Sequence, residues 1–158
     1  MTKEERIAKA RDLFMQGYNC SQSVTAAFAD LYGIDEQVAL KISASFGGGI
    51  GRMRQTCGAA CGMFILAGLE TGTTDPTNRM GKAKNYKAVQ YLANKFKEEN
   101  GSLCCGDLLG LKKSEPNQDT TPEQRTKEYY KKRPCPDIVA IAAKIFADYL
   151  KEKNDFKS

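Results

Sequence analysis

The chain has 158 residues, the usual length of one domain, so we expect a single domain over residues 1–158. Hydrophobic residues make up 41% and charged residues 27% of the sequence, a balance that excludes a disordered or fibrous protein. The longest apolar run, residues 57–69, is too short to cross a bilayer, so no membrane span is expected. The net charge of +5 comes without a nucleic-acid-binding motif, and we therefore predict no nucleic-acid partner.

The sequence contains no histidine, and this absence restricts its chemistry. A Ser-His-Asp or Cys-His nucleophile and every histidine-ligated metal or haem site within the chain are excluded. Six cysteines remain as the obvious carriers of chemistry. The first ten residues are charged and lack the apolar segment of an export signal, so we expect a cytoplasmic location. Thiols stay reduced in the cytoplasm, which favours metal or redox chemistry over structural disulfides.

Apolar periodicity in the first half of the chain predicts three helices. They are expected at residues 7–14, 19–31 and 35–46. Asn19, with Gln22 three residues later, gives a capping-box signal for the second of them. The sequence Gly-Gly-Gly-Ile-Gly at residues 47–51 then predicts a glycine-rich loop.

The second half of the chain is expected to be helical as well. Helices are predicted at residues 56–69, 76–99 and 136–151, with a short turn at 102–109. Asp75-Pro76 is typical of a helix start, and Thr121-Pro122-Glu123 predicts another after a loop at residues 110–121. No segment alternates as a strand does, so the predicted fold class is all-α, a single-domain bundle of about six to seven helices.

Four of the six cysteines fall in the first turn of an expected helix. They are Cys20, Cys57, Cys105 and Cys135. Free N–H groups and the positive end of the helix dipole favour a thiolate there, the form that ligates a metal or attacks a disulfide. The positive charges of Arg52, Arg54 and Arg133 also favour the thiolate over the thiol. The alternative is that each cysteine is a small buried hydrophobe. Cys104 keeps three roles open: a spare thiol, an alternative ligand, or half of a vicinal disulfide with Cys105.

The glycines have more than one interpretation. A glycine-rich loop before a helix can cradle a phosphate, but the lysine of a Walker motif and the strand of a dinucleotide fold are absent. Close approach to a cofactor or to a neighbouring helix explains the glycines equally well, and we expect cofactor contacts at Gly49, Gly51 and Gly58. The Gly58-x-x-x-Gly62 spacing also offers a small-residue face for a homodimer, with Cys61 as a packing residue.

Several cysteine and glycine blocks stand out together. They are Asn19-Cys20, Phe46-Gly-Gly-Gly-Ile-Gly51, Cys57-Gly58-Ala59-Ala60-Cys61-Gly62, residues 101–110, and Cys135-Pro136-Asp137-Ile138-Val139. These blocks resemble the C_GCAxxG_C_C family of redox-active proteins with a CGAxxG motif, and the likeness runs from about residue 4 to residue 151. The family pattern of four cysteines corresponds here to Cys20, Cys57, Cys105 and Cys135, called below the family cysteines. Cys105 is preferred to Cys104 because its spacing to Leu108-Leu109-Gly110 fits the family's C-x-x-L-L-G run.

The resemblance implies a bacterial redox protein, cytoplasmic or exported, that binds an iron–sulfur cluster. It also implies a redox partner protein, an oxidoreductase or a transporter-associated protein.

Three functional hypotheses remain open. In the first, the family cysteines bind one iron–sulfur cluster or another metal centre for electron transfer. In the second, Cys57 and a neighbour, with Cys105 as the candidate, cycle between dithiol and disulfide. In the third, the chain is a helical binding or scaffold protein whose cysteines only pack. Four thiols around a common centre favour the first hypothesis, and one close pair favours the second.

Overall fold

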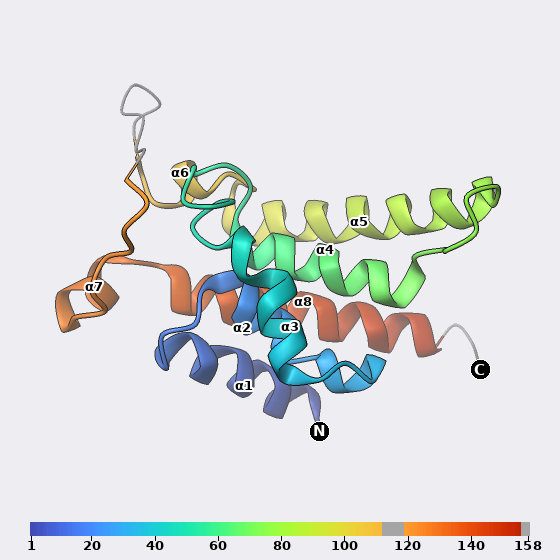
Figure 1. The fold of residues 1–158 in the computed structure, drawn as a ribbon, viewed down its shortest axis with the longest axis horizontal. Coiled ribbons are helices and arrows are strands. Elements are labelled where there is room, and N and C mark those ends of the chain that lie inside the picture. The colour runs from blue at the N-terminus through green and yellow to red at the C-terminus, as the bar shows by residue number, and fades with distance from the viewer. Residues whose placement is uncertain (112–118, 156–158) are drawn as a thin grey trace.

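The computed structural model describes residues 1–111 and 119–155, which form helices and no strand (Figure 1). The α-helices are α1 Lys3–Met15, α2 Cys20–Ala26, α3 Glu36–Ser43, α4 Gly58–Thr71, α5 Arg79–Asn100, α6 Cys105–Leu108, α7 Lys127–Lys132 and α8 Cys135–Asp155. Two short 3-10 helices, η1 Ala29–Tyr32 and η2 Ala44–Phe46, follow α2 and α3. The prediction of an all-α fold is confirmed.

Helix α8 lies at the centre of the bundle. It packs against α1, α2, α4 and α5, which surround it on several sides (Figure 1). Its residues Val139, Ala142, Ala143 and Phe146 are completely buried. This enclosure explains why the sequence of α8 is apolar around most of its circumference. Within the described ranges, no helix combines the length and the apolar character needed to span a membrane.

The helix predicted over residues 19–31 is interrupted in the structure. Asn19 caps α2 as expected, because its side chain accepts a hydrogen bond from the Gln22 N–H. Helix α2 then ends, and η1 begins after Phe28, whose backbone leaves the helical region at φ −125° and ψ 0°. The buried Phe28 ring packs edge-to-face on Phe146, with 5.0 Å between ring centroids. A tertiary contact therefore outweighs local helix propensity at this point.

Helix α5 starts later than predicted. The carboxylate of Asp75 accepts hydrogen bonds from both the N–H and the hydroxyl of Thr77, which fixes a tight turn instead of a helix start. Asn78 is the actual cap, and its side chain accepts from the Gly81 N–H.

The helix predicted to restart at residues 121–123 is also wrong. Helix α7 begins at Lys127, after the cap Thr126. Residues 119–126, called here the strap, stay non-helical because the Arg125 guanidinium donates to the carbonyls of Phe14 and Tyr18. Of the loop predicted at 110–121, residues 112–118 lie outside the described residues.

Candidate functional site

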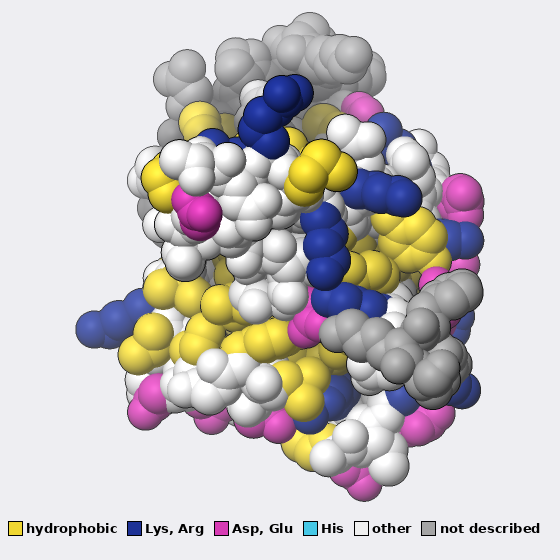
Figure 2. Space-filling view, turned by 90° about the vertical axis from the view of Figure 1, so that its right-hand side faces the viewer, with side chains coloured by type: hydrophobic (Ala, Val, Ile, Leu, Met, Phe, Trp, Pro, Cys, Tyr) yellow, Lys and Arg dark blue, Asp and Glu magenta, His cyan; other side chains and the backbone are white. Residues whose placement is uncertain are grey.

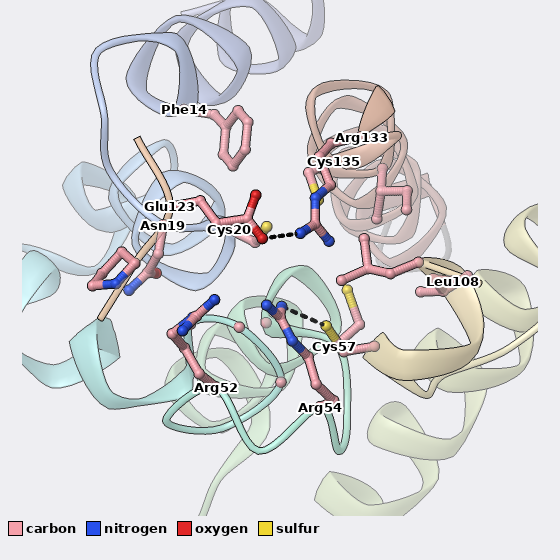
Figure 3. Close-up of a pocket in the computed structure, with 18 of the residues that line it drawn as sticks. Phe14, Asn19, Cys20, Arg52, Arg54, Cys57, Leu108, Glu123, Arg133 and Cys135 are labelled. Carbon is pink, nitrogen blue, oxygen red and sulfur yellow. Dashed lines mark hydrogen bonds and ion pairs between the residues drawn. The ribbon is translucent and has the colours of Figure 1, made fainter. Parts of the chain in front are cut away.

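A cavity of about 450 Å³ lies at the end of the bundle where several helices begin (Figure 3). The family cysteines Cys20, Cys57, Cys105 and Cys135 all line it. Three of them are the first residues of α2, α6 and α8, and Cys57 is the cap of α4. All six cysteines of the chain are free thiols. The fold therefore gathers at one place the four residues that the sequence analysis selected.

Cys20 reaches the cavity because α2 and α4 approach each other closely. A Cβ atom at Gly58 would lie 2.9 Å from the Phe46 carbonyl oxygen and 3.3 Å from the Cys20 Cβ. One turn later, a Cβ atom at Gly62 would lie 2.9 Å from the Val24 Cβ. We expected the small-residue face of Gly58 and Gly62 to be available for a homodimer. Helix α2 of the same chain covers this face instead.

Backbone hydrogen bonds hold Cys57 and Cys105 side by side. The Cys57 N–H donates to the Leu103 carbonyl and the Cys105 N–H donates to the Gln55 carbonyl, each at 2.6 Å. The glycine-rich loop packs on the same pair, because a Cβ atom at Gly49 would lie 2.6 Å from the Cys105 Cβ. The close approach of the loop to Cys105 therefore requires glycine at residue 49.

The glycine-rich loop also carries two arginines to the cavity. Arg52 and Arg54 have positive φ angles of 62° and 59°, and Ile50 has 65°. Residues other than glycine adopt this left-handed region at a conformational cost, and such strained positions cluster at functional sites. Gly51 lines the cavity as well, with no atom within 4 Å of an added Cβ. Cofactor contact at these glycines stays a prediction.

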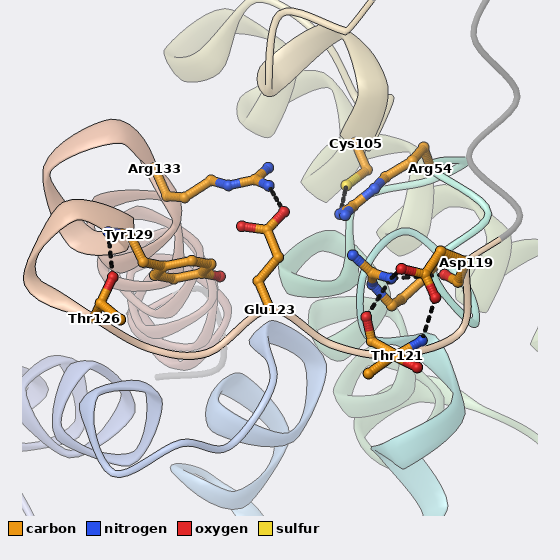
Figure 4. Close-up of polar contacts among 9 residues, drawn as sticks. Arg54, Cys105, Asp119, Thr121, Glu123, Thr126, Tyr129 and Arg133 are labelled. Carbon is orange, nitrogen blue, oxygen red and sulfur yellow. Dashed lines mark hydrogen bonds and ion pairs between the residues drawn. The ribbon is translucent and has the colours of Figure 1, made fainter.

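The cavity has an excess of positive charge. Its charged lining residues are Arg52, Arg54, Arg125, Arg133 and Glu123. Arg133 pairs with Glu123, and one Arg54 nitrogen donates to the Cys105 Sγ at 3.7 Å (Figure 4). The far end of the bundle differs, since Figure 2 shows basic and acidic side chains intermixed there. Four arginines and one glutamate thus give the cavity lining its positive charge.

Two of the lining charges were missed by the sequence analysis. Glu123 and Arg125 lie in the strap, where a helix was predicted and no motif marks either residue. Arg125 donates to the carbonyls of Phe14 and Tyr18 at 2.6 and 3.0 Å, and its guanidinium lies 4.0 Å from the centroid of the Phe14 ring. Only the docking of the strap on the end of α1 brings these two side chains to the cysteines.

Cys20 and Cys135 line the same cavity, and the ionisation of each thiol affects the other. The neighbouring Cys20 thiol, together with the positive charges of Arg133, Arg125 and Arg54, lowers the pKa of Cys135 to about 7, although burial opposes this shift. The same interaction between the two thiols, followed by burial, raises the pKa of Cys20. We place the thiolate on Cys135 because the arginines act on that side chain.

The other two family cysteines are protonated thiols at neutral pH. Burial raises the pKa of Cys57 to about 12, and it raises the pKa of Cys105 despite the nearby Arg54. We expected a lowered pKa at every helix N-terminus, and this is wrong for Cys20, Cys57 and Cys105. For Cys57 and Cys105, removal from water outweighs the helix dipole, and for Cys20 the interaction with Cys135 is the larger cause.

Cys61 and Cys104 do not line the cavity. The Cys61 thiol is buried and donates to the Thr56 carbonyl at 3.9 Å, in agreement with a packing role. The Cys104 thiol donates to the Arg54 carbonyl at 3.3 Å, and the Cys104 backbone forms an isolated bridge with Thr56. Cys104 therefore fastens the loop to α6 as a thiol separate from Cys105.

The predicted metal ligands Cys20, Cys57, Cys105 and Cys135 share one cavity, but their side chains do not form a tight cluster. Within residues 1–111 and 119–155, no three cysteine or carboxylate side chains are close enough together to hold a metal ion. The donor chemistry nevertheless fits a thiolate-bound centre, since four thiols and an excess of arginines meet in one cavity. The two thiols whose pKa values depend most on each other are Cys20 and Cys135, whereas the sequence favours Cys57 and Cys105 as the reacting pair.

Comparison with known proteins identifies a family for this chain. The family model described as "Putative redox-active protein (C_GCAxxG_C_C)" matches residues 18–149 of the chain. Neither the curated proteins nor the solved structures yield a match. The matched span contains all the family cysteines, the glycine-rich loop and the strap. The chain belongs to the C_GCAxxG_C_C family, whose members are described as redox-active proteins.

Proposed function

We propose that the chain carries out thiol–disulfide redox chemistry, with Cys20 and Cys135 as the reacting pair. The observation that supports this function is the interaction of the two thiols, which lowers the pKa of Cys135 and raises the pKa of Cys20, inside a cavity lined by arginines. Cys135 opens the 21-residue helix α8, whose N-terminal dipole adds to the field of Arg133. Both cysteines are only partly buried, so a substrate sulfur in the cavity can reach them.

The reaction conserves atoms and electrons without a further cofactor. The Cys135 thiolate attacks one sulfur of a substrate disulfide, the substrate S–S bond breaks, and the first substrate thiolate leaves. The Cys20 thiol gives its proton to that thiolate and attacks the Cys135 sulfur, which releases the second substrate thiolate. The substrate gains two electrons, and the Cys20–Cys135 disulfide forms. A dithiol on a redox partner protein restores the pair by the reverse sequence.

Oxidation followed by peptide mapping tests the pairing. Trypsin leaves Cys20 in peptide 12–41 and Cys135 in peptide 133–144, so their disulfide has a distinctive mass. We expect this link to form first under limiting diamide, a thiol-specific oxidant. Cys20→Ser and Cys135→Ser should abolish it, and Cys61→Ser serves as the matched control because its thiol lies outside the cavity. A first disulfide between Cys57 and Cys105 would contradict the proposed pair.

A second function is favoured by the convergence of all four family cysteines on one cavity. In this alternative, Cys20, Cys57, Cys105 and Cys135 hold an iron–sulfur cluster or another thiolate-bound metal centre. Such a centre supplies single-electron transfer to a partner redox protein. The lining arginines would offset the negative charge of four thiolates.

The two functions differ in their dependence on Cys57. Protein purified without oxygen should be brown and should contain iron and acid-labile sulfide if the cluster is present, and Cys57→Ser should lose all three signals. The Cys20–Cys135 exchange should survive the same substitution. Colourless, iron-free protein after anaerobic reconstitution with iron and sulfide would rule out the cluster.

A further inference from the structure

The cavity has the size of a small-molecule site. Its volume of about 450 Å³ lies within the range of roughly 300–1,000 Å³ that ligand pockets occupy. The strap forms one wall and is fastened at both ends: Arg52 donates to the carbonyls of Asp119 and Thr121, and Arg125 donates to the Phe14 carbonyl. The strap and the ends of the helices thus enclose a space of small-molecule size around the thiols.

The charges of the lining do not cancel. Arg133 is paired with Glu123, and Arg52 lies 3.9 Å from a carboxylate oxygen of Asp119. Arg54 and Arg125 have no carboxylate partner in the part of the chain that the structure describes. Two guanidinium groups without a carboxylate partner among the described residues therefore border the cavity.

Arg54 has unused hydrogen-bonding capacity. Its Nη1 donates to the Cys105 Sγ at 3.7 Å, and its buried Nε has no hydrogen-bond partner among the described residues. Buried polar groups are satisfied in most native proteins, and an unsatisfied one needs an explanation. A carboxylate offers the two oxygens that a guanidinium fork binds best.

Apolar side chains complete the lining. Phe14, Leu108 and Ile138 border the cavity beside the cysteines. The combination suits a ligand with methylene groups next to sulfur and an anionic group at its end. On the basis of the thiol–disulfide function above, we propose that the substrates are small aliphatic disulfides that carry carboxylates, bound through Arg54 in the positive field of Arg125.

Three short disulfides of different charge test this substrate class. They are 3,3′-dithiodipropionate, which is anionic, bis(2-hydroxyethyl) disulfide, which is neutral, and cystamine, which is cationic. The rate of Cys20–Cys135 disulfide formation is followed by acid quenching, alkylation and peptide mapping. Each rate is divided by the rate of the same disulfide with the uncharged free thiol N-acetylcysteamine, because leaving-group pKa alters intrinsic reactivity.

We expect the normalised rate for the anionic disulfide to exceed that for cystamine at least about tenfold at low salt, and to fall as salt is added. Arg54→Gln should bring the ratio toward one, and Arg54→Lys should preserve much of it because the charge remains. Arg79→Gln is the matched control, since Arg79 is an exposed residue that does not line the cavity. If a cavity variant fails to fold, the ratio of the normalised rates for the anionic and cationic disulfides in the wild-type protein still tests the substrate class.

The outcomes separate this inference from the function on which it rests. Exchange at equal normalised rates, or a preference for cystamine, would overturn the anionic substrate class and leave the reacting pair intact. Exchange with a protein disulfide alone would overturn the small-molecule site. Failure of diamide to link Cys20 with Cys135 would overturn both proposals.

Discussion

Gly58→Ala should damage the cysteine cavity by adding a single methyl group. The new Cβ would lie 2.9 Å from the Phe46 carbonyl oxygen, 3.3 Å from the Ser21 backbone nitrogen and 3.3 Å from the Cys20 Cβ. Two of these neighbours are backbone atoms of packed elements, so relief requires α2 and α4 to separate. Overpacking of this kind costs about 1–3 kcal/mol, and alanine returns about 0.5–1 kcal/mol of helix propensity. We expect a net loss of roughly 1–2 kcal/mol.

Gly68→Ala is the matched control on the same helix. Gly68 is exposed, and nothing lies within 4 Å of an added Cβ. Alanine there should stabilise the protein by about 0.5–1 kcal/mol. Urea unfolding under reducing conditions, followed by the helical circular dichroism signal, measures both changes.

The same two variants connect packing with chemistry. Separation of α2 from α4 moves Cys20 relative to Cys135, so Gly58→Ala should slow formation of the Cys20–Cys135 disulfide, and Gly68→Ala should not. The reasoning is refuted if Gly58→Ala is as stable as Gly68→Ala, because the close approach of the two helices would then have no energetic consequence.

Three further predictions concern stability and thiol reactivity. Arg6→Ala should lose about 2 kcal/mol, because the buried guanidinium donates to the Ala27 carbonyl and to both Asp30 carboxylate oxygens. Arg11→Ala, which breaks the exposed ion pair with Asp137, should lose less than about 1 kcal/mol, and equal losses would contradict the burial argument. Alkylation of Cys135 by iodoacetamide should be half-maximal near pH 7, while Cys57 stays unmodified; equal labelling of the two at pH 7 would reverse the assignment of the thiolate. Burial raises the pKa of Cys57 from its ordinary 9.0 to about 12, so the folded state holds this proton more tightly than the unfolded chain. The resulting stability is complete below pH 9 and is lost as the pH rises toward 12, and Cys57→Ala should make the alkaline loss of unfolding free energy less steep.

The sequence alone was sufficient for the fold class and for the selection of the candidate residues. Apolar spacing is read within a few turns of helix, so α4, α5 and α8 were recognisable without knowledge of their neighbours. The capping box of Asn19 and Gln22 is equally local, since it joins residues three positions apart. The same local signals placed four cysteines at the starts of helices, and their blocks identified the family.

Only the tertiary structure brings Cys20 and Cys135 into one cavity and lowers the pKa of one thiol while raising that of the other. Cys20 and Cys135 meet through the packing of α2 and α4 around α8, and no local pattern encodes that contact. Burial raised the thiol pKa of Cys57, where helix position alone had suggested the opposite. The strap delivers Arg125 and Glu123 to the cavity through hydrogen bonds with the end of α1. The charge and burial around each thiol at this site depend on residues that are far apart in the chain. The spacing of residues along the sequence therefore does not predict them.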